Sequence, residues 1–409
     1  MIQEGELIKM NTLFMAPQPF YQERGTPIAV DRILQVLSER GERIDLVTWH
    51  EGQDMTYDRV NIHRIPNLPI RNIRPGFSVA KIICDIFMLF VVLRLVSRRR
   101  YHLVHAVEEA VFIALLLKII FKVPYVYDMD SSLAQQVIER FPRLAVLAPI
   151  LNFFEGLAVR NAKAVVPVCD ALATVIERHE PEKVVVLQDI SLLSPEGPRI
   201  PEDLRTQLSI QGQLLMYVGN LESYQGIDLL LQSFALTLEK TDQADLVIIG
   251  GEMQDIQKYQ EQCRQFGIEQ RVHFLGPRPI EYLAVYLAQA DILVSPRIKG
   301  NNTPMKIYSY LDSGKPLLAT DLPTHTQVLD QRVALLARPA PAQFATGMLH
   351  LVQDAGLRAQ LGIAGRLLVE EKFTYKAFQK RVNGLFDWLN TEIDPTAAPA
   401  RTSARIAAP

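Results

Sequence analysis

The sequence of 409 residues is long enough for two domains of ordinary size. Hydrophobic residues make up 48% and charged residues 22%, as in ordinary globular proteins, and a net charge of −2 gives no reason to expect nucleic acid as a partner. The three cysteines are scattered and the histidines form no HExxH pair, so neither a disulfide framework nor a zinc site is indicated.

The first residues lack the basic and apolar regions of a signal peptide. The most apolar stretches are Val79–Val96, which charged residues interrupt, and the short segment Ala110–Phe121. Because a bilayer span needs about 20 apolar residues, neither is expected to cross a membrane. We expect a cytoplasmic protein, or one that sits peripherally at the inner face of the membrane.

Strands and helices alternate through the first half of the chain. After a polar loop that ends at Gly25, Thr26-Pro27 opens a helix that ends at Gly41. The alternation predicts a parallel sheet covered by helices on both faces. The predicted strands are Thr12–Ala16, Arg43–Thr48, Val60–Ile65, Leu103–Val107, Pro124–Tyr127 and Ala164–Val168.

Acidic residues follow two of these strands. Glu108 and Glu109 come after Leu103–Val107, and Asp128 and Asp130 come at the end of the next strand. Ligands of open parallel sheets bind beyond the carboxyl ends of the strands, so these acids are expected beside a binding cleft. They could hold a metal ion, but a hard cation needs more ligands than two acids supply. The alternative is a helix cap or a charged rim.

The segment from Arg64 to Arg100 is basic, with Asp85 as its one acid, and it contains the apolar helix predicted over Val79–Val96. A basic rim beside an apolar helix can rest on an anionic membrane surface. The alternative is an internal helix of an α/β domain that ends in solvated arginines.

Gln188–Pro201 is rich in Ser, Pro and Gly and is the best linker candidate. A strand–helix alternation then restarts, with a helix predicted over Ile227–Leu238. No strand is followed by G-x-G-x-x-G and there is no P-loop, which argues against a dinucleotide or ATPase site. Three predicted strands end in glycine-containing turns: Leu214–Val218 before Gly219–Gly226, Leu246–Ile249 before Gly250-Gly251, and Val272–Leu275 before Gly276.

The segment Ile292–Thr320 combines a strand, a cationic loop and a helix start. Ile292–Ser295 and Leu317–Thr320 read as buried strands, and Thr303-Pro304 is predicted to open the helix between them. Helix N-termini bind phosphate, and Arg297, Lys299 and Lys306 lie close by in sequence. The segment predicts a diphosphate cradle, and the alternative is an ordinary capped helix with solvated cations.

These segments together resemble the retaining GT-B glycosyltransferases of family 4, whose pattern is strand–P-S–loop–E-x7-E–A-x-G-x-P–strand. The matching residues are Ser295-Pro296, Ser313-Gly314-Lys315-Pro316 and the strand after them. The two glutamate positions fall on Asn301 and Ser309, and the Arg and Lys positions of the first glycine turn fall on Asn220 and Gln225. The resemblance spans nearly the whole chain, and these departures indicate a variant subgroup.

The resemblance implies an α/β fold of GT-B type, two Rossmann-like parallel-sheet domains facing each other across a cleft. Residues 1–190 would form the acceptor domain and 191–372 the donor domain for a nucleotide diphosphate sugar. A helix over 373–390 would pack back on the first domain, and 391–409 would be a disordered tail rich in Ala and Pro.

The resemblance also implies roles for single residues. Lys306 and Arg297 would stabilise the departing diphosphate, so that no metal is needed, and transfer would retain the anomeric configuration. Asp130 takes the approximate place of a family histidine, and a sugar or lipid-linked sugar would be the acceptor. Asn301 and Asp130 complete the catalytic candidates with Lys306 and Arg297. The donor-site candidates are Gly219, Asn220, Gln225, Gly226, Gly250, Gly251, Leu275, Gly276, Asn302, Thr303, Pro304 and Ser309, and the acceptor-site candidates are Gly25, Thr26, His105, Glu108, Glu109 and Asp128.

Two other functions remain open at this stage. The losses at the glutamate positions would suit a non-catalytic sugar-nucleotide-binding scaffold, which the retained cations oppose. The same fold serves sugar-nucleotide epimerases, for which Asp130 and His105 are the evident acid–base candidates.

Overall fold

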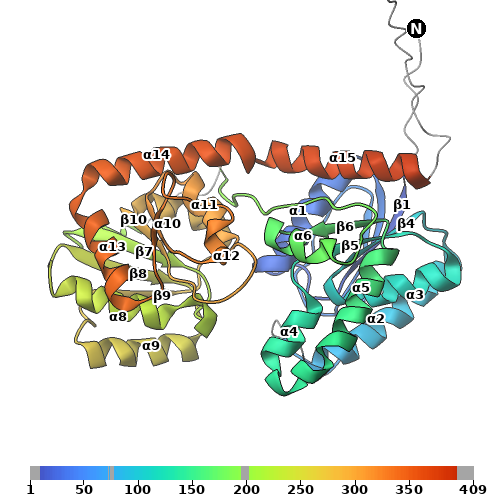
Figure 1. Cartoon of the computed structure of the whole chain (residues 1–409), viewed down its shortest axis with the longest axis horizontal. Coiled ribbons are helices and arrows are strands. Elements are labelled where there is room, and N and C mark those ends of the chain that lie inside the picture. The colour runs from blue at the N-terminus through green and yellow to red at the C-terminus, as the bar shows by residue number, and fades with distance from the viewer. Residues whose placement is uncertain (1–9, 72, 74–77, 195–201, 394–409) are drawn as a thin grey trace, which may run out of the picture. The chain divides into compact units, whose positions relative to one another are not determined.

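The computed structural model describes residues 10–71, 73, 78–194 and 202–393. They form two compact units: unit 1 comprises the residues up to Leu187 together with those from Gln379 onward, and unit 2 comprises Gln188–Phe378 (Figure 1). The chain therefore leaves unit 1 three residues before the predicted boundary at 190. The first nine residues, in which no signal peptide is expected, and most of the predicted tail lie outside the described residues.

Unit 1 is built on a six-stranded parallel sheet with the strand order β3-β2-β1-β4-β5-β6. The order reverses at β1, as in doubly wound folds, so ligand sites are expected where the central strands end. Before the chain passes into unit 2, the elements of unit 1 are β1 Asn11–Ala16, α1 Gly25–Glu39, β2 Arg43–Thr48, β3 Val60–Arg64, α2 Val79–Arg98, β4 Leu103–Val107, the 3-10 turn η1 Glu108–Ala110, α3 Val111–Phe121, β5 Tyr125–Met129, α4 Leu133–Arg140, the 3-10 turn η2 Pro142–Leu147, α5 Ala148–Asn161, β6 Ala164–Pro167 and α6 Asp170–Glu177.

Helices α2, α3 and α5 form one layer on a single face of this sheet. Their inner residues, including Met88 of α2, Leu117 of α3 and Ala158 of α5, pack in one core with Leu13 and Met15 of β1. The buried residues of α1 contribute nothing to this core. The sheet is thus covered on both faces, as the alternation of strands and helices predicts.

Unit 2 repeats the architecture with the strand order β12-β11-β10-β7-β8-β9. One core lies between the sheet and α8, α9 and α13, and a second core lies between the other face and α10 and α11. The elements are α7 Leu204–Gln207, β7 Gln213–Val218, the 3-10 turn η3 Ser223–Gln225, α8 Ile227–Leu238, β8 Ala244–Ile249, α9 Met253–Phe266, β9 Val272–Gly276, the 3-10 turn η4 Ile280–Tyr282, α10 Leu283–Gln289, β10 Ile292–Ser295, α11 Lys306–Asp312, β11 Leu317–Thr320, α12 Pro323–Thr326, β12 Leu335–Ala337, α13 Pro341–Gln353 and α14 Ala355–Lys372.

Helix α15, Tyr375–Ile393, returns the chain to unit 1. Its buried Phe386 and Leu389 face inward, and the carboxylate of Asp387 accepts a hydrogen bond from Arg40 at 2.6 Å. The helix continues through Ile393, so residues 391–393 are helical and the predicted tail starts three residues too early.

Two details of unit 1 are less regular. Val184 forms a single parallel bridge with Val165, beside β6. Helix α1 begins at Gly25 rather than at Thr26, so Pro27 is the third helical residue. A proline tolerates this position because the first helical N–H groups have no partner inside the helix.

Candidate functional site

The carboxyl ends of β7, β8 and β9 are joined through their glycine turns. The N–H of Gly219 donates to the carbonyl of Ile249 at 2.9 Å, and the N–H of Gly250 donates to the carbonyl of Gly276 at 2.8 Å. A side chain at Gly250 would lie 2.2 Å from the Gly219 carbonyl oxygen. The turns are thus close-packed on one another, and only glycine permits this approach.

The ammonium group of Lys306 lies against the first of these turns. A Cβ atom at Gly219 would be 2.4 Å from the Lys306 Nζ, and the ring centroid of Tyr217 is 3.9 Å from it. The side-chain oxygen of Gln225 is the nearest polar partner, at 3.5 Å. Residues far apart in the sequence therefore place one cation over the end of β7.

Arg297 supplies a second buried cation directly after β10. Its guanidinium donates to the carbonyl of Lys299 at 2.7 Å and to the side-chain oxygen of Asn302 at 3.0 Å. The aromatic ring of Tyr224 faces it, with the ring centroid 5.2 Å away. Arg297 is only 8% exposed, so it is held rigidly inside the loop that it begins.

Within the described part of the chain, neither Lys306 nor Arg297 forms an ion pair with a carboxylate. Burial lowers the pKa of both groups, and the positive charge of Arg297 lowers the pKa of Lys306 further. Buried cations are ordinarily paired, because removing a charge from water is costly. Two adjacent cations without a counter-charge make a site that favours an anion.

The loop between β10 and α11 differs from the predicted helix start. Helix α11 begins at Lys306, not at Thr303-Pro304, because the preceding turn is closed by a 3-10 type bond from Ile307 N–H to the Pro304 carbonyl at 2.9 Å. Thr303 does not cap the helix: its hydroxyl is buried and has no partner among the described residues. This unsatisfied hydroxyl is a further polar group beside Lys306.

In unit 1, the acids after β4 and β5 form a second polar cluster. Glu108 is buried and accepts hydrogen bonds from the Ser131 hydroxyl, and the Thr26 side chain of α1 lies beside Asp130. Burial raises the pKa of both carboxyl groups, and their neighbouring acids raise it further. Glu109 is instead paired with Lys81 of α2 at 2.7 Å. Protonated carboxyl groups at a strand end can donate to, as well as accept from, a hydroxylated ligand.

Two family models match the chain and together cover most of it. The model described as "Glycosyl transferase 4-like domain" matches residues 24–188, and the model described as "Glycosyl transferases group 1" matches residues 212–354. The chain belongs to the glycosyltransferases. The first match falls within unit 1 except for its last residue, and the second falls within unit 2.

Relatives of this glycosyltransferase are distant in sequence. It is 26% identical over 290 residues to a D-inositol 3-phosphate glycosyltransferase of Corynebacterium diphtheriae, covering 66% of this chain and 66% of that protein, just under two thirds. It is 20% identical over 398 residues to an uncharacterized glycosyltransferase of Methanocaldococcus jannaschii, covering 89% and 95% of the two chains.

Solved structures share the fold over nearly the whole glycosyltransferase. A sucrose-phosphate synthase from Thermosynechococcus elongatus superposes with a TM-score of 0.76 at 17% identity, covering 94% of this chain and 100% of that chain. Anabaena HepE, solved in complex with UDP, superposes with a TM-score of 0.71 at 17% identity, covering 93% and 100%. With the two parallel sheets, these likenesses confirm two Rossmann-like domains of GT-B type.

Two candidate residues of the glycosyltransferase are buried. Ser309 is fully buried, and its hydroxyl accepts from the backbone N–H of Leu192 at 3.0 Å, so it holds the first residues of unit 2 in place. His105 is also buried, paired with Asp128 at 3.0 Å and stacked on Phe14. Both side chains are thus engaged inside the fold, and their roles at the donor and acceptor sites stay predictions.

The His105–Asp128 pair also bears on the epimerase hypothesis. That hypothesis requires His105 and Asp130 as an acid–base pair, whereas His105 is bonded to Asp128. Among the described residues, no group of three or more His, Cys, Asp or Glu side chains is arranged to hold a metal ion.

The other donor-site candidates lie around the two cations or at the strand ends. Gln225 is buried, Asn302 binds Arg297, and Gly226 packs against the Pro296 carbonyl, which a Cβ would approach to 2.0 Å. Gly251 packs against Leu221, and Leu275 and Gly276 end β9. Asn220 and Asn301 are exposed, and Gly25 is the exposed first residue of α1.

Sequence reasoning missed the residues that support Arg297. His325 is fully buried and bridges the hydroxyls of Ser295 and Thr320, each at 2.9 Å, and the Thr320 hydroxyl donates to the Arg297 carbonyl at 2.5 Å. Burial and the nearby cations lower the pKa of His325 to about 4, so the imidazole is neutral. Its position 28 residues after Arg297 carries no local signal for this contact.

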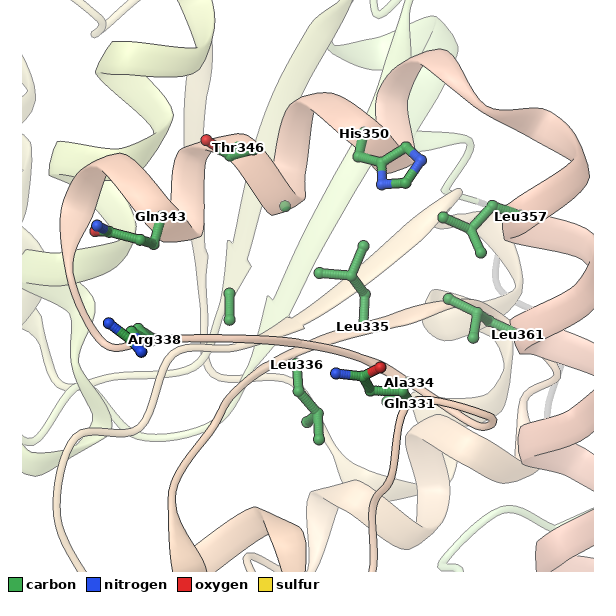
Figure 2. A pocket seen from close by; sticks show the side chains of 12 residues that line it. Gln331, Ala334, Leu335, Leu336, Arg338, Gln343, Thr346, His350, Leu357 and Leu361 are labelled. Carbon is green, nitrogen blue, oxygen red and sulfur yellow. The ribbon is translucent and has the colours of Figure 1, made fainter.

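A hollow of about 600 Å³ in unit 2 lies apart from these residues (Figure 2). Leu335 of β12 and Leu357 and Leu361 of α14 line it, with His350 and Gln343 of α13 at its side. Neither Lys306 nor Arg297 is among its lining residues. The candidate site is therefore the cation pair at the strand ends.

Proposed function

We propose that this glycosyltransferase takes its sugar from a UDP- or GDP-sugar and transfers it to a hydroxyl acceptor with retention of the anomeric configuration. The observation that carries the proposal is the buried pair Lys306 and Arg297, which lacks a carboxylate counter-charge among the described residues. A diphosphate supplies the missing negative charge. HepE, which shares the fold, has been solved with UDP and with UDP-glucose, and this supports a donor of that class.

The proposed reaction breaks the bond between the anomeric carbon and the diphosphate oxygen. The bonding electrons move to that oxygen, and Lys306 and Arg297 stabilise the charge that develops there. The acceptor oxygen bonds to the anomeric carbon on the same face, and its proton passes to the leaving phosphate. Two cations offset the diphosphate charge, so we propose that the reaction needs no metal ion.

We propose that the acceptor binds unit 1 beside Glu108 and Asp130. Carboxyl groups with raised pKa values suit a hydroxylated sugar, which offers both donors and acceptors. We further propose a sugar or lipid-linked sugar as the acceptor, in surface polysaccharide or glycolipid synthesis, met at an anionic membrane surface.

Thermal melting against UDP, GDP, ADP and CMP, each with EDTA and with magnesium, tests the donor assignment. A nucleotide at about 100 times its dissociation constant adds about 2.7 kcal/mol to stability, which is a rise of roughly 5–10 °C for a domain of this size. We expect such a rise with UDP or GDP in EDTA. A rise that requires magnesium would refute metal independence, and no rise with any diphosphate would refute the donor site.

A further inference from the structure

The outer surface of unit 1 carries an unusual concentration of apolar side chains. Of the 21 large hydrophobic side chains that are exposed among the described residues, 16 lie between Val79 and Phe154 of unit 1 and five lie in unit 2. Apart from Phe141, which follows α4, they lie on α2, α3, α5 and the turn η2. Figure 1 shows where these three helices lie in unit 1. We call this surface the apolar layer.

Polar contacts tie the three helices of the apolar layer together. The Lys81–Glu109 ion pair joins the start of α2 to the turn before α3, and the ammonium of Lys118 on α3 donates to the carbonyl of Asn161 at the end of α5. Side chains that are half exposed or more stand on each helix: Phe90 on α2, Ile119 and Ile120 on α3, and Phe153 and Phe154 on α5. A soluble monomer rarely gathers more than a few hundred Å² of contiguous apolar surface.

The exposed charges on the same helices have one sign. Arg94, Arg98 and Arg160 are exposed, whereas the acids of these helices turn inward. Asp85 accepts from the Trp49 indole at 3.1 Å, and the buried Glu155 accepts from the Ser132 hydroxyl at 2.9 Å. The helices therefore offer exposed cations and no exposed carboxylate.

The topology collects these cations along one edge. Each of the three helices connects parallel strands, so all three run opposite to the strands and end where the strands begin. Arg94 and Arg98 lie in the last two turns of α2, Lys122 caps α3, and Arg160 lies in the last turn of α5. This basic rim is at the opposite edge of the sheet from Glu108 and Asp130.

From this arrangement we propose that the apolar layer docks on an anionic lipid bilayer. The helices lie flat in the interface, their apolar side chains enter the acyl boundary, and the rim cations meet lipid phosphates. No helix among the described residues is both long and apolar enough to cross a bilayer. The docking proposal rests on the proposed function in one respect: a lipid-linked acceptor would be reached at that membrane surface. The docking itself is argued from the exposed side chains alone.

The sequence pattern suggested a membrane contact through the basic segment Arg64–Arg100, whereas the structure favours the outer side of the three helices. The arginine run at residues 98–100 is not a free cationic cluster, because Arg99 donates to both carboxylate oxygens of Asp45 at 2.9 Å. Asp45 also accepts from the Tyr101 hydroxyl at 2.7 Å. The apolar side chains of α3 and α5 supply eight of the 16 exposed side chains, so the proposed contact extends well beyond α2.

Cosedimentation with vesicles tests the proposal without any catalytic readout. The double variant Ile119→Asp, Phe153→Asp places two charges in the layer, and Ile363→Asp is the matched control because Ile363 is 64% exposed on α14 of unit 2. We expect the wild type and the control to bind vesicles of phosphatidylcholine with phosphatidylglycerol, and the double variant to bind at least about tenfold more weakly. Replacing Arg94, Arg98 and Arg160 by Gln should remove the preference over pure phosphatidylcholine.

Equal vesicle binding by the double variant and the wild type, or no binding by the wild type, would overturn the proposal. Self-association in the absence of lipid that the double variant abolishes would assign the layer to a second copy of the chain instead. The UDP or GDP melting shift of each variant reports on unit 2 separately. Vesicle binding without a nucleotide shift would refute the donor assignment and leave the docking surface standing.

Discussion

Replacing Lys306 by methionine should have opposite effects on donor binding and on the stability of the fold. Methionine keeps most of the aliphatic length but removes the charge. In the ligand-free protein that charge lies beside Arg297 without a carboxylate partner among the described residues, and its pKa is lowered by burial and by Arg297. We therefore expect Lys306→Met to bind the donor poorly while folding at least as stably as the wild type.

The two effects have opposite signs and can be sized separately. An unsatisfied buried polar group costs about 1–3 kcal/mol, and the Tyr217 ring at 3.9 Å offsets roughly 1–2 kcal/mol of this for Lys306. Removing the charge should thus change stability by about +1 kcal/mol, or a rise of about 2–4 °C in Tm. Losing one donor to the developing charge should lower kcat by about 10²–10³.

The assay pairs ligand-free melting with a single-turnover transfer measurement on the same preparations. Lys299→Met serves as the control because Lys299 is exposed on the same loop, and it should leave both quantities near wild type. A Lys306→Met protein with near-wild-type turnover, or with a Tm several degrees lower, would refute the reasoning.

Four further predictions test the surrounding residues. Gly219→Ala should displace the ammonium group and lower turnover at least tenfold, while Gly267→Ala, also at positive φ but with no atom near its Cβ, should cost only stability; equal effects on turnover would contradict this. Because a bound anion raises the lowered pKa of Lys306, donor affinity should fall as pH rises through the range in which Lys306 loses its proton, and the fall should be absent in Lys306→Met; a donor affinity with the same pH dependence in both proteins would count against it. Asp130→Asn should lower transfer but not donor binding. It should also flatten the loss of stability as pH rises through the raised pKa of that carboxyl, a loss that occurs because the folded state binds more protons than the unfolded chain; an unchanged pH–stability curve would argue against this. Ser309→Ala should cost about 1 kcal/mol of stability with donor affinity unchanged, and a loss of affinity would support its assignment to the donor site.

The order and type of the main elements could be read from the sequence. The predicted strands Arg43–Thr48, Leu103–Val107 and Ile292–Ser295 and the helix Ile227–Leu238 match the structure residue for residue. Each strand is an apolar segment of a doubly covered sheet, and the helix buries one apolar face against such a sheet. Burial of this kind leaves a local record in the residue pattern, so no knowledge of the partner strand is needed.

Only the tertiary structure decided which side chains meet. Lys306 reaches Gly219 and Tyr217 because β7 and β10 are adjacent in the sheet, and no local pattern encodes that adjacency. The same holds for His325, which supports Arg297 through Ser295 and Thr320. It also holds for Ser309, which occupies one of the two glutamate positions of the family pattern. Its hydroxyl is held inside the fold by a backbone N–H more than one hundred residues away in the sequence.

The exposed side of the helix layer completes this contrast. The sequence marked α2 as apolar, but it could not show that α2, α3 and α5 lie on one face of the sheet with their apolar residues outward. That depends on the handedness of the crossover connections, which places all three helices in one layer and their basic ends on one edge. Periodicity tells which residues are buried along one element, whereas a surface shared by several elements exists only once the chain has folded.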